Sequence, residues 1–583
     1  MTAISPRWDI SQPDKAAVSR LTESLGLKHA TTSVLVNRGV IGTEEAAAFL
    51  DPRLAQLPNP GSLKDMDRAV ARTVAARVGG HSICIYGDFD ADGMTSTALL
   101  AEFLALAGFD VRTFLPDRIR DGYGVHKQRL RELIEAGAKL VITVDCGIRS
   151  HDEVAFASSL GADMIILDHH EPDDVLPQAA AVVNPRRADC TSAFKGLAAV
   201  GVSFYFAGAV RRALVAAGLL AEGAIDLRQL LDLVAVGTIA DVVPLLGDNR
   251  VFASAGLKRI NESPRLGLVA LKAVAEVDGR AVTAGTVGFA LAPRLNAVGR
   301  LGDARVGLDL LMSRDPEEAK RTADLLNREN DARRDVLRIV LDDARGRVEA
   351  SGGATRRAIV LAGEGWHPGV VGIVAARLVE TYQRPTIVLS IDDGVAKGSC
   401  RSVRGFDIGA ALARFAGMLD RFGGHPMAAG LALPLANLQA FTAAFLDFAD
   451  LEVPLTSLVP RLAIDAILGS GDTDIPLANE LARLAPFGMG NPEPVFASTG
   501  VILSESRIVG RDRSHLRMTF ATDRGTIGGM WFQGAAAGQA LSAGDKVDVA
   551  YAVEIDDRSG EARWKVRDCR PAGTRAFELG GLP

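Results

Sequence analysis

Three aspartates between a strand pattern and a helix pattern constrain this chain more than any other feature. Residues 82–86, SICIY, form a short β-prone run, and from Thr95 onward apolar residues recur at helical spacing. Asp88, Asp90 and Asp92 therefore lie at the carboxyl end of a strand, just before a helix. Because open α/β sheets bind their ligands at this edge, the run predicts an α/β domain with a functional site here.

The three carboxylates of this run predict a metal site. Like charges within five residues repel one another, and hard divalent cations, which prefer carboxylate oxygens, offset that repulsion. DFDADG also matches the start of an EF-hand calcium loop. Counted from Asp88, however, loop position 12 is Leu99, where a bidentate Glu is required, and a strand pattern precedes the loop. The pattern thus favours a catalytic metal site over a structural calcium site.

Length and composition indicate a multidomain globular protein. A chain of 583 residues is too long for one core and suggests three or four domains. The chain is 48% hydrophobic and 23% charged, an ordinary globular balance. Its net charge of -6 shows no overall basic character, so any nucleic-acid contact must use local basic patches. On charge alone, a protein without a polyanionic partner remains an alternative.

The cysteines and the hydropathy pattern predict a cytoplasmic protein. The five cysteines form no CxxC pair, so neither a zinc site nor a disulfide framework is indicated, and a reducing compartment fits. Residues 1–56 hold no signal-peptide pattern, and no apolar run reaches the 18 residues that a membrane span needs. We therefore expect a soluble protein without a membrane partner.

Between residues 81 and 186, short apolar runs alternate with helical patterns. This alternation predicts a mainly parallel sheet covered by helices. The predicted strands lie in SICIYG, VRTFLP, LVITVDCG, MIILDHH and AAVVNPR.

Further ligand-type residues follow two of these strands. Asp145 ends LVITVD, and Asp168, His169 and His170 end MIILDHH. Each alone has an ordinary alternative, as a helix cap or a loop side chain. On neighbouring strands of one sheet, together with the aspartates at 88–92, they converge on one edge. Asp241 lies in an otherwise apolar segment, where a lone carboxylate is costly unless it is paired, binds metal or caps a turn.

The remainder of the chain predicts a connector, a second α/β domain and a barrel. From Asp315, an expected N-cap followed by Pro316, about 35 residues form a helix about 50 Å long. A second α/β pattern follows, and short strands from 457 to 575 suggest a small barrel such as an OB-fold. Its basic residues and its candidates for base stacking are Arg507, Arg511, Arg513, Arg517, Trp531, Phe532 and Trp564. The alternative is that both tryptophans are core residues.

The ordered set GDFDADG, VDCG, DHH and IADVVPL resembles the four core motifs of the DHH phosphoesterase superfamily. The later KGSCRS and GGHPMAAG resemble its DHH-associated, substrate-binding domain. With PRLNAVGR at 293–300, almost the whole chain is similar to the superfamily's single-strand-specific DNA exonucleases. The resemblance implies a helical lead-in (1–75), a parallel-sheet DHH domain (76–314), a connecting helix (315–350), a DHH-associated domain (351–450) and an OB-fold (457–575).

The resemblance also implies a site for two ions, Mn²⁺ or Mg²⁺. The matching metal ligands are Asp88, Asp90, Asp92, Asp145, His169 and Asp241. Among them, Asp145 matches the bridging carboxylate. His170 is implied to orient the scissile phosphate or to polarise the site, and Asp168 to hold a histidine. Tyr86 departs from the pattern, because many relatives with small substrates have a His there.

Further residues are implied to bind the DNA strand. Arg118, Ser399 and Arg401 match positions that would grip a 5′-phosphate, for which guanidinium groups are suited. Arg294, Asn296, Arg300 and His425 would line the path of the strand. For each arginine the alternative is a surface ion pair.

The activity implied by the resemblance is processive 5′ to 3′ hydrolysis of single-stranded DNA to 5′-mononucleotides. A monomer acting in DNA recombination and repair, with single-strand-binding protein and a helicase, is the implied setting. One alternative is a hydrolase of short oligoribonucleotides or cyclic dinucleotides, against which the last 120 residues argue. Another is a non-catalytic DNA-binding scaffold, against which the intact motifs argue. A structural metalloprotein would unfold on chelation and show no turnover.

Overall fold

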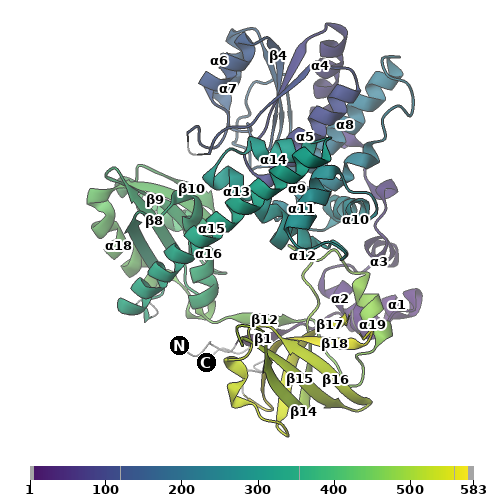
Figure 1. Cartoon of the computed structure of the whole chain (residues 1–583), viewed down its shortest axis with the longest axis vertical. Helices are drawn as coiled ribbons and strands as arrows, with labels where there is room; N and C mark the ends of the chain where they lie inside the picture. Colours follow the sequence, from purple (N-terminus) through teal and green to yellow (C-terminus); the bar gives the residue numbers. More distant parts are fainter. Residues whose placement is uncertain (1–5, 119, 353–354, 557–558, 575–583) are drawn as a thin grey trace. The chain divides into compact units, whose positions relative to one another are not determined.

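The computed structural model describes residues 6–118, 120–352, 355–556 and 559–574. The chain divides into two compact units, and each is described by itself (Figure 1). Unit 1 comprises residues 1–46, 332–483 and 494–583, and unit 2 comprises residues 47–331 and 484–493.

Unit 2 is built on a parallel sheet of five strands with the order β3-β2-β4-β5-β6. The strands are β2 (Ser82–Tyr86), β3 (Val111–Phe114), β4 (Ala138–Val144), β5 (Asp163–Leu167) and β6 (Ala181–Val183). In the register, Tyr86 lies opposite Thr143, and Thr143 lies opposite Ile166. The carboxyl ends of β2, β4 and β5 therefore meet at one edge, which confirms the predicted parallel sheet.

Helices cover both faces of this sheet, and three of them position the site (Figure 1). The site helices are α5 (Ala91–Leu106), α8 (Ala199–Ala216) and α9 (Leu231–Ala240). A Cβ on Gly237 of α9 would lie 2.3 Å from Thr95 Oγ1, so only glycine lets α9 approach α5 this closely. The other helical elements are α4 (Met66–Val78), α6 (Lys127–Glu135), α7 (His151–Ser159), α10 (Gly247–Glu262), α11 (Leu266–Val274), α12 (Ala284–Thr286), α13 (Ala292–Leu301) and α14 (Arg305–Met312).

Among the described residues, α8 alone is long and apolar enough to be a candidate membrane span, and 61% of it is buried inside the protein.

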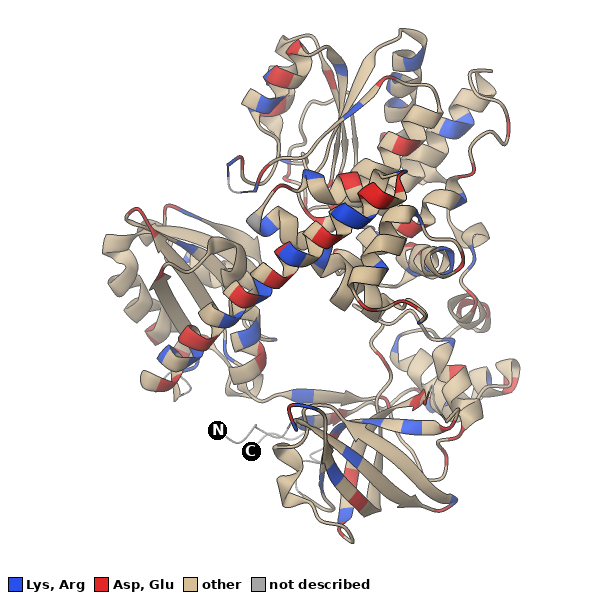
Figure 2. Ribbon diagram, viewed as in Figure 1, with Lys and Arg blue, Asp and Glu red and all other residues tan. Residues whose placement is uncertain are grey.

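The connecting helix α15 (Pro316–Ala350) forms as predicted. Asp315 Oδ1 accepts a hydrogen bond of 2.7 Å from the Glu318 N–H, which confirms Asp315 as the N-cap. Acidic and basic residues alternate along the helix (Figure 2). Ala323 packs into the core of unit 2, whereas Ala344 packs into a core of unit 1.

The second α/β domain lies in unit 1 and has a mixed sheet with the order β10-β11-β9-β8-β7. Only β7 and β8 are parallel within it. Its elements are β7 (Ile359–Glu364), α16 (Pro368–Tyr382), β8 (Thr386–Asp392), β9 (Val395–Arg401), α17 (Ile408–Ala413), β10 (Arg421–His425), β11 (Ala428–Pro434) and α18 (Leu438–Glu452).

The predicted barrel forms from five strands in the order β14-β15-β16-β18-β17, and β17 closes it by pairing with β14. The strands are β14 (Phe496–Val509), β15 (His515–Thr522), β16 (Gly525–Trp531), β17 (Lys546–Ile555) and β18 (Ala562–Pro571), and β13 (Ala466–Ile467) adds to β14. Trp531 and Trp564 are buried, and the Trp564 ring stacks on Tyr551 at 4.0 Å. The prediction that these tryptophans stack on bases is therefore wrong, and the alternative that they are core residues is confirmed. Phe532 is exposed.

The N-terminal residues of unit 1 pair with a distant segment. Strand β1 (Arg7–Ile10) pairs in parallel with β12 (Arg461–Ile464). Helices α1 (Lys15–Leu25) and α2 (His29–Asn37) follow, and Lys28 Nζ lies 2.6 Å from Asp474 Oδ1, the N-cap of α19 (Ile475–Ala482). Helix α3 (Thr43–Leu50) then leads into unit 2.

Residues 484–493 return to unit 2 before the barrel begins. The buried Arg250 on α10 donates hydrogen bonds to the carbonyl oxygens of Leu484 (2.9 Å) and Ala485 (2.8 Å). Leu245 N–H donates to the Met489 carbonyl at 2.8 Å. These backbone contacts make the segment an integral part of unit 2.

Candidate metal centre

The turn between β2 and α5 places the first three carboxylates. Asp90 is the N-cap of α5, and its Oδ1 accepts hydrogen bonds from the N–H groups of Asp92 (2.9 Å) and Gly93 (3.1 Å). A Cβ on Gly93 would lie 2.4 Å from the Asp88 carbonyl oxygen, so the tight turn requires glycine. Asp88 and Asp92 are buried on either side of this cap.

The amino terminus of α8 holds Asp92. Its Oδ2 accepts from the Ala199 N–H at 2.7 Å, and its Oδ1 accepts from the Val200 N–H at 3.0 Å. Free N–H groups and the positive end of the helix dipole both favour an anion at this position. Each carboxylate oxygen keeps a second lone pair that can bind a cation.

Residues from β4, β5 and α9 complete the cluster. Asp145 follows β4 with a φ of 63°, a left-handed conformation that Asp tolerates better than most residues. His169 follows β5, and its Nε2 lies 3.2 Å from Asp145 Oδ1 and 3.6 Å from Asp241 Oδ2. Asp241 is the C-cap of α9. The structure thus brings together all six predicted metal ligands.

The six side chains form two groups of three. In each group the candidate ligand atoms lie within 4.8 Å of one another, and the groups are Asp88, Asp90 and Asp145, and Asp92, His169 and Asp241. No residue belongs to both. A third group, of Asp145, His169 and His170, links them. Each group of three could hold one cation, and Asp145 belongs to the first group as well as to the group that links the two.

The polar atoms of the cluster fit divalent cations. Among the described residues, nothing forms a hydrogen bond with the buried atoms Asp88 Oδ1, Asp145 Oδ1, Asp241 Oδ2 and His169 Nε2. Polar atoms without partners are costly to bury, and cations would satisfy them. Five carboxylates with a single imidazole form a hard ligand set that suits Mn²⁺ or Mg²⁺.

The pKa values of the cluster agree with this interpretation. Burial, and then the neighbouring Asp90 carboxylate, raise the pKa of Asp88 well above its usual value and that of Asp92 to about 7. Burial and the surrounding aspartates likewise raise the pKa values of Asp145 and Asp241. Burial lowers the pKa of His169 to about 3, so its imidazole is neutral and can bind a metal.

Asp168 organises the two histidines and is itself fully buried. Its Oδ1 lies 2.8 Å from His170 Nδ1 and accepts from the N–H groups of His169 (2.7 Å) and His170 (3.1 Å). Its Oδ2 accepts from the Ile148 N–H at 3.0 Å. Burial would lower the pKa of His170, but the hydrogen bond and the charge of Asp168 outweigh it and raise that pKa. Asp168 therefore favours a cationic His170.

A polar cavity of about 170 Å³ opens beside the cluster. It brings together three predicted metal ligands and three predicted substrate residues, namely Asp90, Asp92, Asp241, Arg118, Asn296 and Arg300. Asn296 Oδ1 accepts from the Ala91 N–H at 2.8 Å, and the Arg118 guanidinium lies 4.9 Å from the centre of the Phe89 ring.

Arg294, by contrast, is buried. Its guanidinium donates to Asn327 Oδ1 (2.9 Å) and to the Ala290 carbonyl (2.7 Å), so in this structure it braces α13 from within.

The remaining predicted substrate residues lie in unit 1. Ser399 and Arg401 share one face of β9, opposite α16. A Cβ on Gly372 of α16 would lie 3.1 Å from Ser399 Oγ and 3.3 Å from Arg401 Nη2, so glycine lets the helix backbone approach both. His425 is exposed on β10.

Tyr123 is a residue of the site that the sequence analysis missed. Its hydroxyl lies 3.3 Å from His170 Nδ1 and donates to the Asp145 carbonyl at 3.4 Å. The available signal was an aromatic residue between Gly122 and Gly124, both of which have positive φ.

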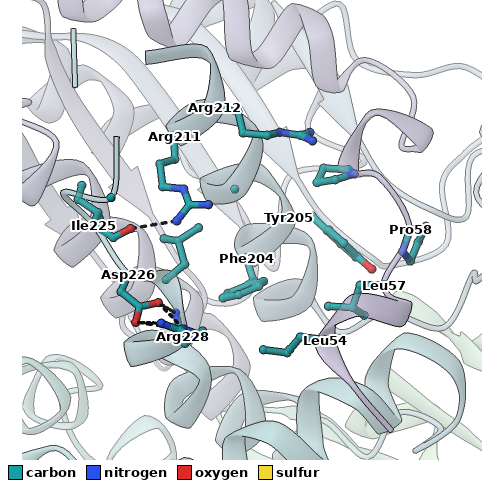
Figure 3. A pocket seen from close by; sticks show the side chains of 14 residues that line it. Leu54, Leu57, Pro58, Phe204, Tyr205, Arg211, Arg212, Ile225, Asp226 and Arg228 are labelled. Atoms are coloured by element: carbon teal, nitrogen blue, oxygen red, sulfur yellow. Dashed lines mark hydrogen bonds and ion pairs between the residues drawn. The ribbon is translucent and has the colours of Figure 1, made fainter. Parts of the chain in front are cut away.

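A separate cavity of about 520 Å³ in unit 2 shares no lining residue with the metal-ligand groups (Figure 3). Two of its arginines are engaged with protein groups, since Arg228 pairs with Asp226 at 2.8 Å and Arg211 donates to the Ile225 carbonyl at 3.0 Å. It is not part of the metal centre.

Comparison with known proteins agrees with the motifs. Residues 82–238 match the DHH family N-terminal domain, residues 355–450 the DHHA1 domain, and residues 464–567 the RecJ OB domain. Over 585 aligned residues the chain is 37% identical to the single-stranded-DNA-specific exonuclease RecJ of Bacillus subtilis (strain 168), covering 100% of this chain and 73% of that protein. The chain belongs to the RecJ family.

Solved structures of RecJ proteins share this fold. RecJ of Thermus thermophilus in complex with Mn²⁺ has a TM-score of 0.82 at 33% identity, covering 97% of this chain and 80% of that one. The same protein in complex with Mg²⁺ has a TM-score of 0.75 at 30% identity, covering 97% and 79%. RecJ of Thermus thermophilus thus binds each of the two ions that suit the ligand set of this chain.

Proposed function

We propose that this chain is a metal-dependent exonuclease that hydrolyses single-stranded DNA from the 5′ end and releases 5′-mononucleotides. The observation that carries the proposal is the division of six ligands, four of them buried and two half-buried, into two groups of three in a member of the RecJ family. In the proposal, each group holds one Mn²⁺ or Mg²⁺.

When bound, two such ions lower the pKa of a water between them and stabilise negative charge on the phosphate oxygens. The side chains fix the geometry of that reaction. Asp145 belongs to two of the three ligand groups, and its backbone conformation aims it at the edge shared by β2, β4 and β5. The N–H groups of α8 hold Asp92, which prevents its rotation away from the centre.

His170 is proposed to bind and orient the scissile phosphate. With Nδ1 held by Asp168, its Nε2 is left to donate a proton to a phosphate oxygen. The raised pKa of His170 favours the charged form of that donor, and charge-assisted hydrogen bonds are the stronger ones.

The cavity residues are proposed to position the substrate. Arg118 and Arg300 line the cavity that the metal ligands also line, and Asn296, which lines it too, accepts a hydrogen bond from the Ala91 backbone. Ser399 and Arg401 of unit 1 are proposed to recognise a 5′-phosphate, and His425 is proposed to line the path of the strand. Arg294 is buried and donates to Asn327 and Ala290, so it is not included in the proposed path.

The barrel is proposed to extend the binding surface. In its register Arg507 lies opposite Arg517, Arg517 opposite Met530, and Met530 opposite Lys565. Cations directly opposite one another destabilise a sheet, and a phosphate backbone would relieve that repulsion. The exposed Phe532 adds a surface on which a base can stack.

The proposed setting is cytoplasmic DNA recombination and repair, with single-strand-binding protein and a helicase as partners of a monomer. Membership of the RecJ family supports single-stranded DNA as the substrate. The protein partners, the domain boundaries given above and the oligomeric state are predictions.

The test is Mn²⁺-dependent digestion of a 5′-phosphorylated, 3′-labelled oligonucleotide beside its duplex and RNA counterparts. We expect progressive shortening of the single-stranded DNA alone. Asp145→Asn should abolish it, whereas Asp173→Asn, a change at a half-exposed residue that pairs with Arg149, should not. Binding without cleavage would favour the scaffold, and cleavage confined to short RNA would favour an oligoribonuclease.

A further inference from the structure

A π-helical turn, η4 (Val287–Leu291), carries an unusually exposed aromatic residue in unit 2. Val287 and Leu291 are fully buried and anchor the turn, whereas Phe289 between them is 84% exposed. Phenylalanine is among the residues most often buried, and π turns inside helices recur at functional sites. The fold therefore holds this ring in solvent on a firmly anchored segment.

The turn packs beside the metal centre. A Cβ on Gly288 would lie 3.9 Å from Ile239 Cγ2, so η4 rests on the end of α9 that leads to the ligand Asp241. The next residue, Val242, has a φ of 58° and is 60% exposed. A β-branched residue in this conformation is strained, and such strain clusters at functional sites. Two exposed apolar side chains thus flank the segment that carries Asp241.

The turn also runs directly into the helix that lines the polar cavity. Asn296 and Arg300 of α13 line that cavity together with Asp241. Asn296 follows Phe289 by seven residues, or about 10 Å along a helix at 1.5 Å per residue. That distance corresponds to about three stacked nucleotides at 3.4 Å each. A strand whose phosphate lies in the cavity can therefore reach Phe289 with a nearby base.

We propose that Phe289 is a platform on which a nucleobase of the single strand stacks close to the metal centre, with Val242 extending the apolar surface. The inference rests on the proposed exonuclease function. Stacking accepts any base, because every base has an apolar face. In a duplex those faces are covered by neighbouring base pairs, and exposing one costs unstacking energy. Phe289 is thus a specificity-determining residue that favours single strands without reading their sequence.

The test compares Phe289→Ala with Phe289→Tyr, which keeps an aromatic face. For single-stranded DNA, the alanine variant should raise KM about 5- to 150-fold, the range expected for loss of one stacked base, with a smaller effect on kcat. The KM of the tyrosine variant should stay within about threefold of the wild-type KM. Val78→Ala, at a 71% exposed position on α4, is the matched control and should change neither constant.

A second readout is the fluorescence of 2-aminopurine placed singly at the first four positions of a 5′-phosphorylated, phosphorothioate oligonucleotide. Wild type should quench one position, and Phe289→Ala should lose that quenching. An unchanged KM and unchanged quenching in Phe289→Ala would overturn the proposal. So would equal losses in the alanine and tyrosine variants, which would indicate a packing role. If wild type binds the oligonucleotide but does not hydrolyse DNA, the exonuclease proposal fails while the quenching comparison still decides the stacking proposal.

Discussion

Asp168→Asn is the substitution that best tests how the site is built. The carboxylate accepts from four donors, namely the N–H groups of Ile148, His169 and His170, and His170 Nδ1. An amide of the same size has only one acceptor oxygen. If the amide oxygen takes the place of Oδ1, the new NH₂ group faces the Ile148 N–H. If the oxygen takes the place of Oδ2, the NH₂ group faces the three donors that bind Oδ1. At least one buried donor is therefore left without a partner.

The expected cost in stability follows from that count. One unsatisfied buried donor costs about 1–3 kcal/mol. For a unit of this size, each kcal/mol corresponds to about 2–4 °C, so a loss near 2 kcal/mol lowers the unfolding temperature by about 4–8 °C. Although burial opposes it, the hydrogen bond from His170 lowers the pKa of Asp168 below its ordinary value. The carboxylate therefore stabilises the fold at neutral pH and ceases to do so only in strong acid, so the loss should be measurable at pH 7.

The expected effect on activity is a change in pH dependence. Asp168 supplies the largest influences that raise the pKa of His170, so without its charge only Asp88 and Asp90 oppose burial, and the pKa of His170 should fall. If the cationic form binds phosphate, activity is lost as pH rises through that pKa. The alkaline limb of the pH–rate profile should therefore move to lower pH, with a loss at pH 7 of about 10- to 100-fold, as for other residues that orient a site.

The assay is digestion of single-stranded DNA from pH 5.5 to 10, together with calorimetry at pH 7. Asp173→Asn, at a half-exposed position, is the control and should leave both measurements unchanged. An unfolding temperature within 1 °C of wild type and an unmoved alkaline limb in Asp168→Asn would refute the reasoning.

Three further outcomes are expected. Arg401→Ala should reduce the preference for 5′-phosphorylated over 5′-hydroxyl ends about tenfold or more by removing a charge-assisted contact, with Mn²⁺ affinity unchanged. The same preference in wild type and variant would exclude that role. Burial raises the carboxylate pKa values of the metal centre, so the metal-free fold should lose stability as pH rises from about 4 to 8. The increase in unfolding temperature on adding Mn²⁺ should therefore grow with pH. An equal increase at pH 5.5 and at pH 8 would contradict this. The double variant Arg507→Gln/Arg517→Gln should reduce the slope of log affinity against log salt by about 1.4, and an unchanged slope would remove these two residues from the DNA-binding surface.

The parts of the site that the sequence could predict are those in which each residue follows a recognisable element. Asp88, Asp145 and His169 each come one or two residues after an apolar run, and the parallel register brings the ends of those runs together. The position of Asp241 relative to the other ligands is harder to predict, because Asp241 caps a helix. Its neighbours follow only from the packing of α9 against α5.

Other features have no local signal in the sequence. The pairing of β1 with β12 joins residues more than 400 positions apart, and four residues are too few to show which partner they choose. The burial of Trp564 could have been predicted, because it alternates with Arg563 and Lys565 along one strand and must face the opposite side. The exposure of Phe289 goes against the usual burial of phenylalanine, and only its position midway between the buried Val287 and Leu291 shows that it faces away from the core.

The decapeptide 484–493 limits how this architecture could be rearranged in evolution. The barrel follows it in the sequence, yet the decapeptide completes the unit that carries the metal centre. A lineage that lost the barrel by a simple deletion from residue 484 onward would also lose the carbonyl groups that Arg250 binds, leaving a buried guanidinium without those partners. Gain or loss of the barrel therefore requires either that these ten residues be kept or that Arg250 change with them.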